Sequence, residues 1–218
     1  MADRPIIFSG PMVRALLDGR KTQTRRALKP PYGMLEYLAD GSWKPICTKV
    51  FPGDRLYVRE AHYLTDDGTS EYAIFAEETA DVTAHREEIE DLQIRQPQID
   101  WSKHLRLRPS IHMPRWASRL TLTVTDVRVQ RLQDISEEDA WAEGCKRGDP
   151  WDNGLGYFPA EEPDPSGIGH VGWDYAKEWF EDLWNSLHGP DAWGANPWVY
   201  AVSFDVQRGN IDTLKLPE

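Results

Sequence analysis

The stretch Asp18-Gly19-Arg20-Lys21-Thr22-Gln23-Thr24-Arg25-Arg26 brings four cations and two hydroxyls together within nine residues. In a β-strand successive side chains point to opposite faces, so Thr24 and Arg26 would share one face and Arg25 would lie on the other. Lys21 follows Gly19 closely, so its flexible side chain can fold back toward the Thr24 hydroxyl. The stretch offers either a nucleophile with a base beside it or a solvated basic turn, the more common role of a run of charges.

A Thr and a Lys at this spacing can act together as nucleophile and base. A hydroxyl becomes a useful nucleophile only when a neighbouring base takes its proton. Burial or nearby cations lower the pKa of a Lys amine, which lets it act as that base. Such cations are present in Arg20, Arg25 and Arg26. Thr24 is therefore the candidate nucleophile and Lys21 its candidate base.

The rest of the chain predicts a mixture of helices and strands. Apolar residues at helical spacing predict a helix over residues 12–17, which Gly19 ends. A second helix, over 136–143, has Ser136 as its N-cap and Gly144 as its stop, and a third, over 175–187, carries a strong apolar stripe. Alternating patterns predict strands over residues 4–9, 21–26, 55–60, 71–77, 120–132 and 196–206. A loop or weak hairpin is expected over residues 32–50.

Two segments do not fit these patterns. Residues 77–100 are acidic and lack a clear amphipathic stripe, which indicates an insertion that is partly helical. Residues 148–172 are rich in Gly and Pro, which indicates a long loop that can serve as a lid. We therefore expect residues 1–218 to form one α+β domain that carries two insertions.

Charge is distributed unevenly along the chain, whose net charge is −11. Residues 1–59 hold 11 Lys and Arg against 5 Asp and Glu, and residues 101–132 hold 7 against 1. The segments 60–100 and 133–218 are strongly acidic. Because the binding of long nucleic acid depends on a positive surface, this distribution favours a local pocket for a nucleoside or a short single strand over an extended duplex groove.

Composition argues against several classes of protein. No run approaches the ~20 apolar residues of a membrane span, and the N-terminus lacks a signal-peptide pattern, so we expect a cytoplasmic protein with no membrane partner. Cys47 and Cys145 are expected to be separate free thiols. The His residues never form a close ligand pair and no phosphate-binding Gly-rich loop is present, so neither a metal nor a cofactor is predicted. The sequence leaves the oligomeric state open.

The run GRKTQTRR at residues 19–26 resembles the GxKTxTxR signature of the ASCH domain family, a branch of the PUA-like β-barrels. Other blocks, including GDRLYVRE at 53–60 and NPWVYAVSFDV at 196–206, resemble those of ASCH proteins commonly encoded by phages and prophages. The resemblance covers nearly the whole chain apart from the two insertions. It implies a PUA-like β-barrel with flanking helices and inserted loops, in the cytoplasm of a bacterial host if a phage encodes it.

One activity in that family is hydrolysis of the acyl amide of N4-acylated cytidine by a Thr, Lys and Glu triad. The family's Lys and Thr match Lys21 and Thr24, and its Glu aligns with Glu143, with Glu138 or Glu60 as alternatives. The resemblance therefore implies an amidohydrolase that acts on an N4-acylated cytosine-type nucleobase or nucleoside, such as N4-acetylcytidine. Lys21 would take the Thr24 proton, Thr24 would attack the amide carbonyl, and Glu143 would orient Lys21 or pass a proton to the departing amine.

Five further residues are candidates for substrate binding. Arg20 and Arg26 belong to the motif itself. Glu60 ends a predicted strand, where an exposed ion pair with Arg55 or Arg59 is the alternative. Arg115 and Trp116 lie in the basic, aromatic segment 101–119, where a base can stack on Trp116 beside an Arg. Burial in the core is the more common role for such a Trp.

Two other functions are compatible with the sequence. PUA-like domains often bind nucleic acid, so the second hypothesis is a non-catalytic module that binds single-stranded RNA or a modified DNA base. A ribonuclease activity, also proposed for some ASCH proteins, ranks third. The acidic balance of the chain favours the amidohydrolase, whereas the segment 101–119 keeps binding without turnover open.

Overall fold

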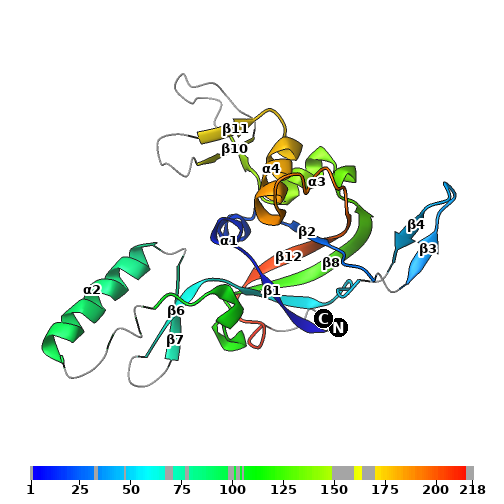
Figure 1. Cartoon of the computed structure of the whole chain (residues 1–218). Coiled ribbons are helices and arrows are strands. Elements are labelled where there is room, and N and C mark those ends of the chain that lie inside the picture. The colour runs from blue at the N-terminus through cyan, green and yellow to red at the C-terminus, as the bar shows by residue number, and fades with distance from the viewer. Residues whose placement is uncertain are drawn as a thin grey trace. The chain divides into compact units, whose positions relative to one another are not determined.

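A computed structural model describes residues 2–31, 34–46, 48–66, 71–76, 79–97, 101, 104, 106–148, 160–163 and 170–214. The chain divides into two compact units. We call Ala15–Asp54 with Thr123–Asp205 the first unit, and Ala2–Arg14, Arg55–Leu122 and Val206–Glu218 the second unit. Figure 1 traces the chain from blue at its N-terminus to red at its C-terminus. The prediction of a single domain stays a prediction.

The largest sheet is mixed and has five strands in the order β1-β5-β8-β12-β2. Their bounds are Asp3–Ile7 for β1, Arg55–Arg59 for β5, Leu120–Arg131 for β8, Trp198–Arg208 for β12 and Gln23–Ala27 for β2. β1 pairs with β5 in parallel, and β12 pairs with β2 antiparallel. The predicted α+β class is confirmed. Over the described residues no closed barrel is detected, so the barrel expectation is not confirmed.

The first unit contains two helices that matter for the site, α3 (Glu137–Ala142) and α4 (Ala176–His188), and they lie next to each other (Figure 1). The apolar stripe predicted for α4 is confirmed, because Trp179, Phe180 and Trp184 are buried. A 3-10 helix, η4 (Leu132–Asp134), precedes α3. The hairpin expected near Asp40 consists of β3 (Leu35–Tyr37) and β4 (Trp43–Pro45).

The Gly- and Pro-rich segment 148–172 is not only a loop, which corrects its prediction. It contains β10 (Ala160–Pro163) and most of β11 (His170–Trp173), which pair antiparallel, and β10 also pairs with β9 (Lys146–Arg147). The sequence of β10 is Ala-Glu-Glu-Pro, whose residues are uncommon in strands. Its composition therefore did not predict that it pairs as a strand. The rest of the predicted loop, 149–159 and 164–169, lies outside the described residues.

The second unit contains a hairpin of β6 (His62–Asp66) and β7 (Glu71–Phe75) and the helix α2 (Thr79–Arg95). It also holds two 3-10 helices, η2 (Ser110–His112) and η3 (Arg115–Ala117). The acidic insertion is thus largely helical, and it buries His85 and Ile89, which are one helical turn apart. The helix α1 (Gly10–Leu17) has residues in both units. Within the described ranges, the helices are all too short or too polar to cross a bilayer.

Candidate functional site

The start of β2 and the end of α3 are joined by backbone contacts within the first unit. After α1 the chain turns at Gly19, whose φ is +73°, and the N–H groups of Arg20 and Lys21 both donate to the Ala15 carbonyl. Lys21 forms an isolated antiparallel bridge with Glu143, and the N–H of Thr22 donates to the Ala142 carbonyl over 2.9 Å. The signature motif is therefore held against the last residues of α3.

The sequence of α3 explains why Glu143 lies at this position. The Ser136 hydroxyl accepts from the Asp139 N–H over 3.1 Å, which caps the start of the helix as predicted. The helix ends at Ala142, and Gly144 takes a φ of +109°, a conformation that glycine adopts readily. Glu143 is the residue between the helix and this turn, so its side chain points from the helix end toward β2.

Two of the three predicted catalytic residues meet in a buried ion pair. The Lys21 Nζ donates to the Glu143 Oε2 over 2.9 Å and to the Glu143 main-chain carbonyl over 2.7 Å. Lys21 is 1% exposed and Glu143 is 3% exposed. A charge removed from water this completely must be paired and hydrogen-bonded, and both conditions are met.

The pKa of the Lys21 amine is subject to opposing influences. Burial is the largest influence and lowers the pKa of its amine from the usual value. The negative charge and hydrogen bond of Glu143 oppose this effect, whereas the cations Arg26 and Arg25 add to it. The amine therefore gives up its proton at a lower pH than an ordinary Lys, as a general base requires.

A second cation completes the ion-pair cluster. Arg25 donates from Nη1 to the Glu143 Oε1 over 3.0 Å and from Nη2 to the Asp139 Oδ2 over 2.6 Å. Asp139 also accepts from Gln23 and from Arg128. The sequence identified Arg25 only as a cation near Lys21, and it gave no sign of Asp139 as a site residue. Strand alternation placed Gln23 and Arg25 on one face, but nothing in the sequence indicated which residues would contact that face.

Thr24 is buried, at 4% exposed, and lies opposite Val202 of β12. By strand alternation its side chain is on the other face of β2 from Gln23 and Arg25. Among the described residues its hydroxyl has no hydrogen-bond partner, so no such bond joins it to Lys21 or Glu143. The structure therefore does not join Thr24 to the Lys21–Glu143 pair by a hydrogen bond.

Arg20 and Arg26, the two substrate-binding candidates of the motif, also lie in the first unit. Arg20 bonds to Asp18 over 3.0 Å and to the Gly144 carbonyl. Arg26 is half-buried, and burial lowers its pKa, an effect that the charges of Tyr200 and Glu143 oppose. Arg26 is thus close enough to the Lys21–Glu143 pair to act on it electrostatically.

Glu60, Arg115 and Trp116 belong to the second unit. Glu60 is 1% exposed and accepts from Arg119 at both oxygens, so the suggested pairing with Arg55 or Arg59 is wrong. Arg115 forms ion pairs with Asp3 and Asp212, each at 2.6 Å. Trp116 is 46% exposed, which rules out its role as core filler.

Three comparisons with known proteins add no relationship. Neither protein-family models, nor curated proteins, nor solved structures gave a significant match. The function of this chain must therefore be inferred from its own residues.

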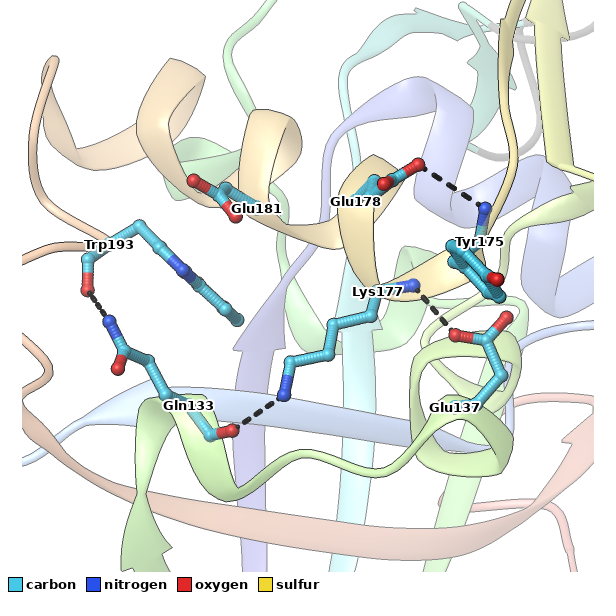
Figure 2. A pocket seen from close by; sticks show the side chains of 7 residues that line it. All are labelled: Gln133, Glu137, Tyr175, Lys177, Glu178, Glu181 and Trp193. Atoms are coloured by element: carbon cyan, nitrogen blue, oxygen red, sulfur yellow. Dashed lines mark hydrogen bonds between the residues drawn. The ribbon is translucent and has the colours of Figure 1, made fainter.

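Two pockets of similar size lie in the first unit. One, of about 460 Å³, is next to the motif and has a basic and aromatic lining that includes Arg20, Thr22, Trp141, Lys146 and Arg147. The other, of about 450 Å³, lies where η4 and α3 meet the start of α4, and Figure 2 shows its lining residues. Lys21, Thr24 and Glu143 line neither of these two pockets.

The described residues include potential metal ligands and the thiol of Cys145. Within those ranges, no group of three or more His, Cys, Asp or Glu side chains is placed to hold a metal ion. Cys145 is buried and forms no disulfide with a described residue, and Cys47 lies outside the described residues. In the described site, Lys21 and Glu143 form a pair of groups that can exchange protons.

Proposed function

We propose that this protein is an amidohydrolase that removes the acyl group from an N4-acylated cytosine-type nucleobase or nucleoside. One observation carries the proposal: the Lys of the GxKTxT segment is buried in a 2.9 Å ion pair with Glu143, and its pKa is lowered. The same residues resemble the triad of ASCH amidohydrolases. We also propose the PUA-like fold of that family for this chain.

The first half of the reaction transfers the acyl group to the enzyme. The Thr24 hydroxyl, which makes no hydrogen bond to Lys21 in the structure, must first come within hydrogen-bond reach of it. Neutral Lys21 then accepts the Thr24 proton as the Thr24 oxygen attacks the amide carbonyl carbon, which gives a tetrahedral oxyanion. The bond from the carbonyl carbon to N4 then breaks. The Lys21 ammonium gives its proton to N4, so the free cytosine amine leaves and an ester on Thr24 is left behind.

The second half hydrolyses that ester. Lys21 removes a proton from a water molecule, whose oxygen attacks the ester carbonyl. Collapse of the intermediate breaks the bond to Thr24 and returns a proton to its oxygen, so the products are a carboxylic acid and the unchanged enzyme. Glu143 holds the amine in place throughout, and Arg26 orients the substrate beside it.

N4-acetylcytidine is the direct test, with release of cytidine followed by chromatography. Thr24→Ala removes no hydrogen bond to a described residue and should lower kcat/KM by at least about 100-fold, and so should Lys21→Ala. Thr22→Ala is the matched control, because Thr22 carries the same hydroxyl in the same motif but is exposed, and it should stay near wild type. Mass spectrometry of the quenched reaction should find the acyl group on Thr24. Full turnover by either Thr24→Ala or Lys21→Ala would end the proposal.

Binding without turnover is the second candidate, and the exposure of Trp116 favours it. An indole that is 46% exposed beside basic residues is a stacking platform for a base. Fluorescence anisotropy with labelled single-stranded RNA should then show binding that weakens with salt and is reduced by Trp116→Ala. Tight binding in a protein that fails to hydrolyse N4-acetylcytidine would favour this candidate over the first.

A further inference from the structure

Arg25 occupies a position in the cluster that the GxKTxTxR pattern does not specify. Its side chain is 0% exposed and divides its guanidinium between two carboxylates, Glu143 at 3.0 Å and Asp139 at 2.6 Å. The Phe180 ring of α4 lies 5.9 Å from the guanidinium carbon. A buried planar cation that spans two anions has little freedom to move, so its geometry is fixed by α3 and by the strand that carries it.

The Asp139 carboxylate, which binds one side of Arg25, is held in place by residues other than Lys21, Thr24 and Glu143. Asp139 accepts from the Gln23 Nε2 over 3.1 Å and from the Arg128 Nη2 over 3.1 Å, and its own N–H is bound by the Ser136 hydroxyl. Arg25 therefore connects a fixed carboxylate to the one that holds Lys21. Glu143 is shared, with Oε1 bound to Arg25 and Oε2 to Lys21.

We propose that Arg25 is a positioning residue that sets how readily Lys21 releases its proton. It neutralises part of the Glu143 charge that would otherwise retain the proton on the amine, and its own charge repels the ammonium. Its effect on protonation stands on the geometry alone. Its importance for turnover rests on the proposed amidohydrolase function.

The charged groups around Lys21 make the expected signs clear. Glu143 acts on it from the end of α3, and Arg25 and Arg26 act from β2, while Arg20 is engaged by Asp18 and the Gly144 carbonyl. Arg25→Gln removes a cation and frees one oxygen of Glu143, so the Lys21 pKa should rise. Asp139→Asn removes an anion and leaves Arg25 to Glu143, so the Lys21 pKa should fall.

Shifts of the Lys21 pKa in opposite directions in Arg25→Gln and Asp139→Asn distinguish this role from a merely structural one. Loss of packing would admit water to the site in both variants and move the Lys21 pKa in the same direction. Arg128→Gln is the matched control, because Arg128 also bonds to Asp139 but is half-exposed and does not contact Glu143. It should leave the Lys21 pKa unchanged.

The experiment is an NMR titration of the lysine side chains in the intact protein, with the Lys21 signal assigned by its loss in Lys21→Arg. A Lys21 pKa that rises in Arg25→Gln and falls in Asp139→Asn supports the proposal. The proposal is overturned if the Lys21 pKa moves in the same direction in both variants, or if it does not move in Arg25→Gln. If Arg25→Gln does not fold, Asp139→Asn decides alone, and a rise in the pKa there overturns the proposal.

A second readout separates this inference from the proposed function. The pH at which N4-acetylcytidine hydrolysis reaches half its maximum should move upward in Arg25→Gln by the same amount as the Lys21 pKa. A wild-type protein that does not hydrolyse N4-acetylcytidine would refute the proposed function. The titration would still decide whether Arg25 sets the protonation of Lys21.

Discussion

Gly144 shows how a single residue shapes the candidate site. Its φ of +109° is strained for any residue with a side chain, and a Cβ built there would lie 2.9 Å from the Ala15 Cβ and 3.1 Å from the Lys21 Cβ. The turn that presents Glu143 thus needs both the conformation and the small size of glycine.

Gly144→Ala should lower the free energy of unfolding by about 2–4 kcal/mol, through backbone strain and the two close contacts. Gly53→Ala is the control, because Gly53 has a φ of +87° but nothing within 4 Å of an added Cβ, and it should cost only about 1–2 kcal/mol. Urea denaturation of both variants measures the difference. Equal losses would mean that Ala15 and Lys21 adjust to the new methyl group.

His62 in the second unit makes stability depend on pH. It is 0% exposed, its Nδ1 bonds to the Glu60 carbonyl, and its Nε2 has no partner among the described residues. Burial lowers its pKa below the usual 6.5, the hydrogen bond to Glu60 opposes this, and the nearby charges of Arg108, Arg59 and His112 add to the lowering. The folded protein therefore holds a neutral His62, whereas the unfolded chain takes up a proton near pH 6.5.

Because the unfolded state binds the extra proton first, stability should be intact above pH 6.5 and should fall as the pH drops from there through the folded-state pKa. The free energy of unfolding, measured by urea titration at several pH values between 7 and 5, should show this slope. His62→Gln should flatten it. An unchanged slope in that variant would assign the pH dependence to other groups.

At the scale of elements, the backbone N–H groups in the first turn of α4 are capped by a residue of another helix. Its N-cap position holds Tyr175, whose side chain makes no capping hydrogen bond. Instead, the Glu137 carboxylate of α3 accepts from the N–H groups of Ala176 over 2.7 Å and Lys177 over 3.1 Å. Figure 2 shows the Glu137 side chain directed at the start of α4. A charge at this end also suits the helix dipole.

Glu137→Ala should therefore lower the free energy of unfolding by about 1–2 kcal/mol, because two N–H groups of α4 lose a charged acceptor. Glu138→Ala removes the same charge from the next position, where the side chain is exposed, and should change stability by less than about 0.5 kcal/mol. Thermal or urea unfolding can compare the two. A similar loss in both would argue that the effect comes from the charge on α3.

Elements with a strong local signal were predictable. The apolar spacing of Trp179, Phe180 and Trp184 predicts α4, and Leu56 and Val58 predict the buried face of β5. The strand β10 was not predictable, because backbone pairing with β9 and β11 decides its conformation against its residue preferences. Ser136 marked the start of α3, but the sequence could not show that Glu137 caps another helix.

The candidate site was predictable only in part. Lys21, Thr24 and Glu143 were named by resemblance to a family motif, and the structure brings Lys21 and Glu143 together. Arg25 and Asp139 are 114 residues apart in the chain, so no local pattern connects them. Long-range contacts of this kind follow from the path of the chain, and a single sequence does not reveal that path.

At the scale of the whole molecule, the charge balance limits the partners. A net charge of −11 repels a polyanion unless a basic surface is present. Several cations of the two basic segments are already paired, including Arg25, Arg55, Arg115 and Arg119. Part of the positive charge of the basic segments is therefore neutralised by the protein's own acids.

Long duplex DNA should accordingly bind poorly. With a labelled duplex of about 20 base pairs, anisotropy should show no saturable binding at about 150 mM salt. A single strand of equal length and label is the matched comparison, since only it can offer unstacked bases to Trp116. Saturable, salt-sensitive binding of the duplex would show that the charge argument is wrong.

The Lys21–Glu143 pair has a consequence for how the protein folds, since 122 residues separate its two members. Closing so long a loop lowers the chain entropy before the contact it brings about can stabilise the protein. The pair is therefore expected to form after the folding transition state. Weakening it should then shorten the lifetime of the native protein and leave the refolding rate nearly unchanged.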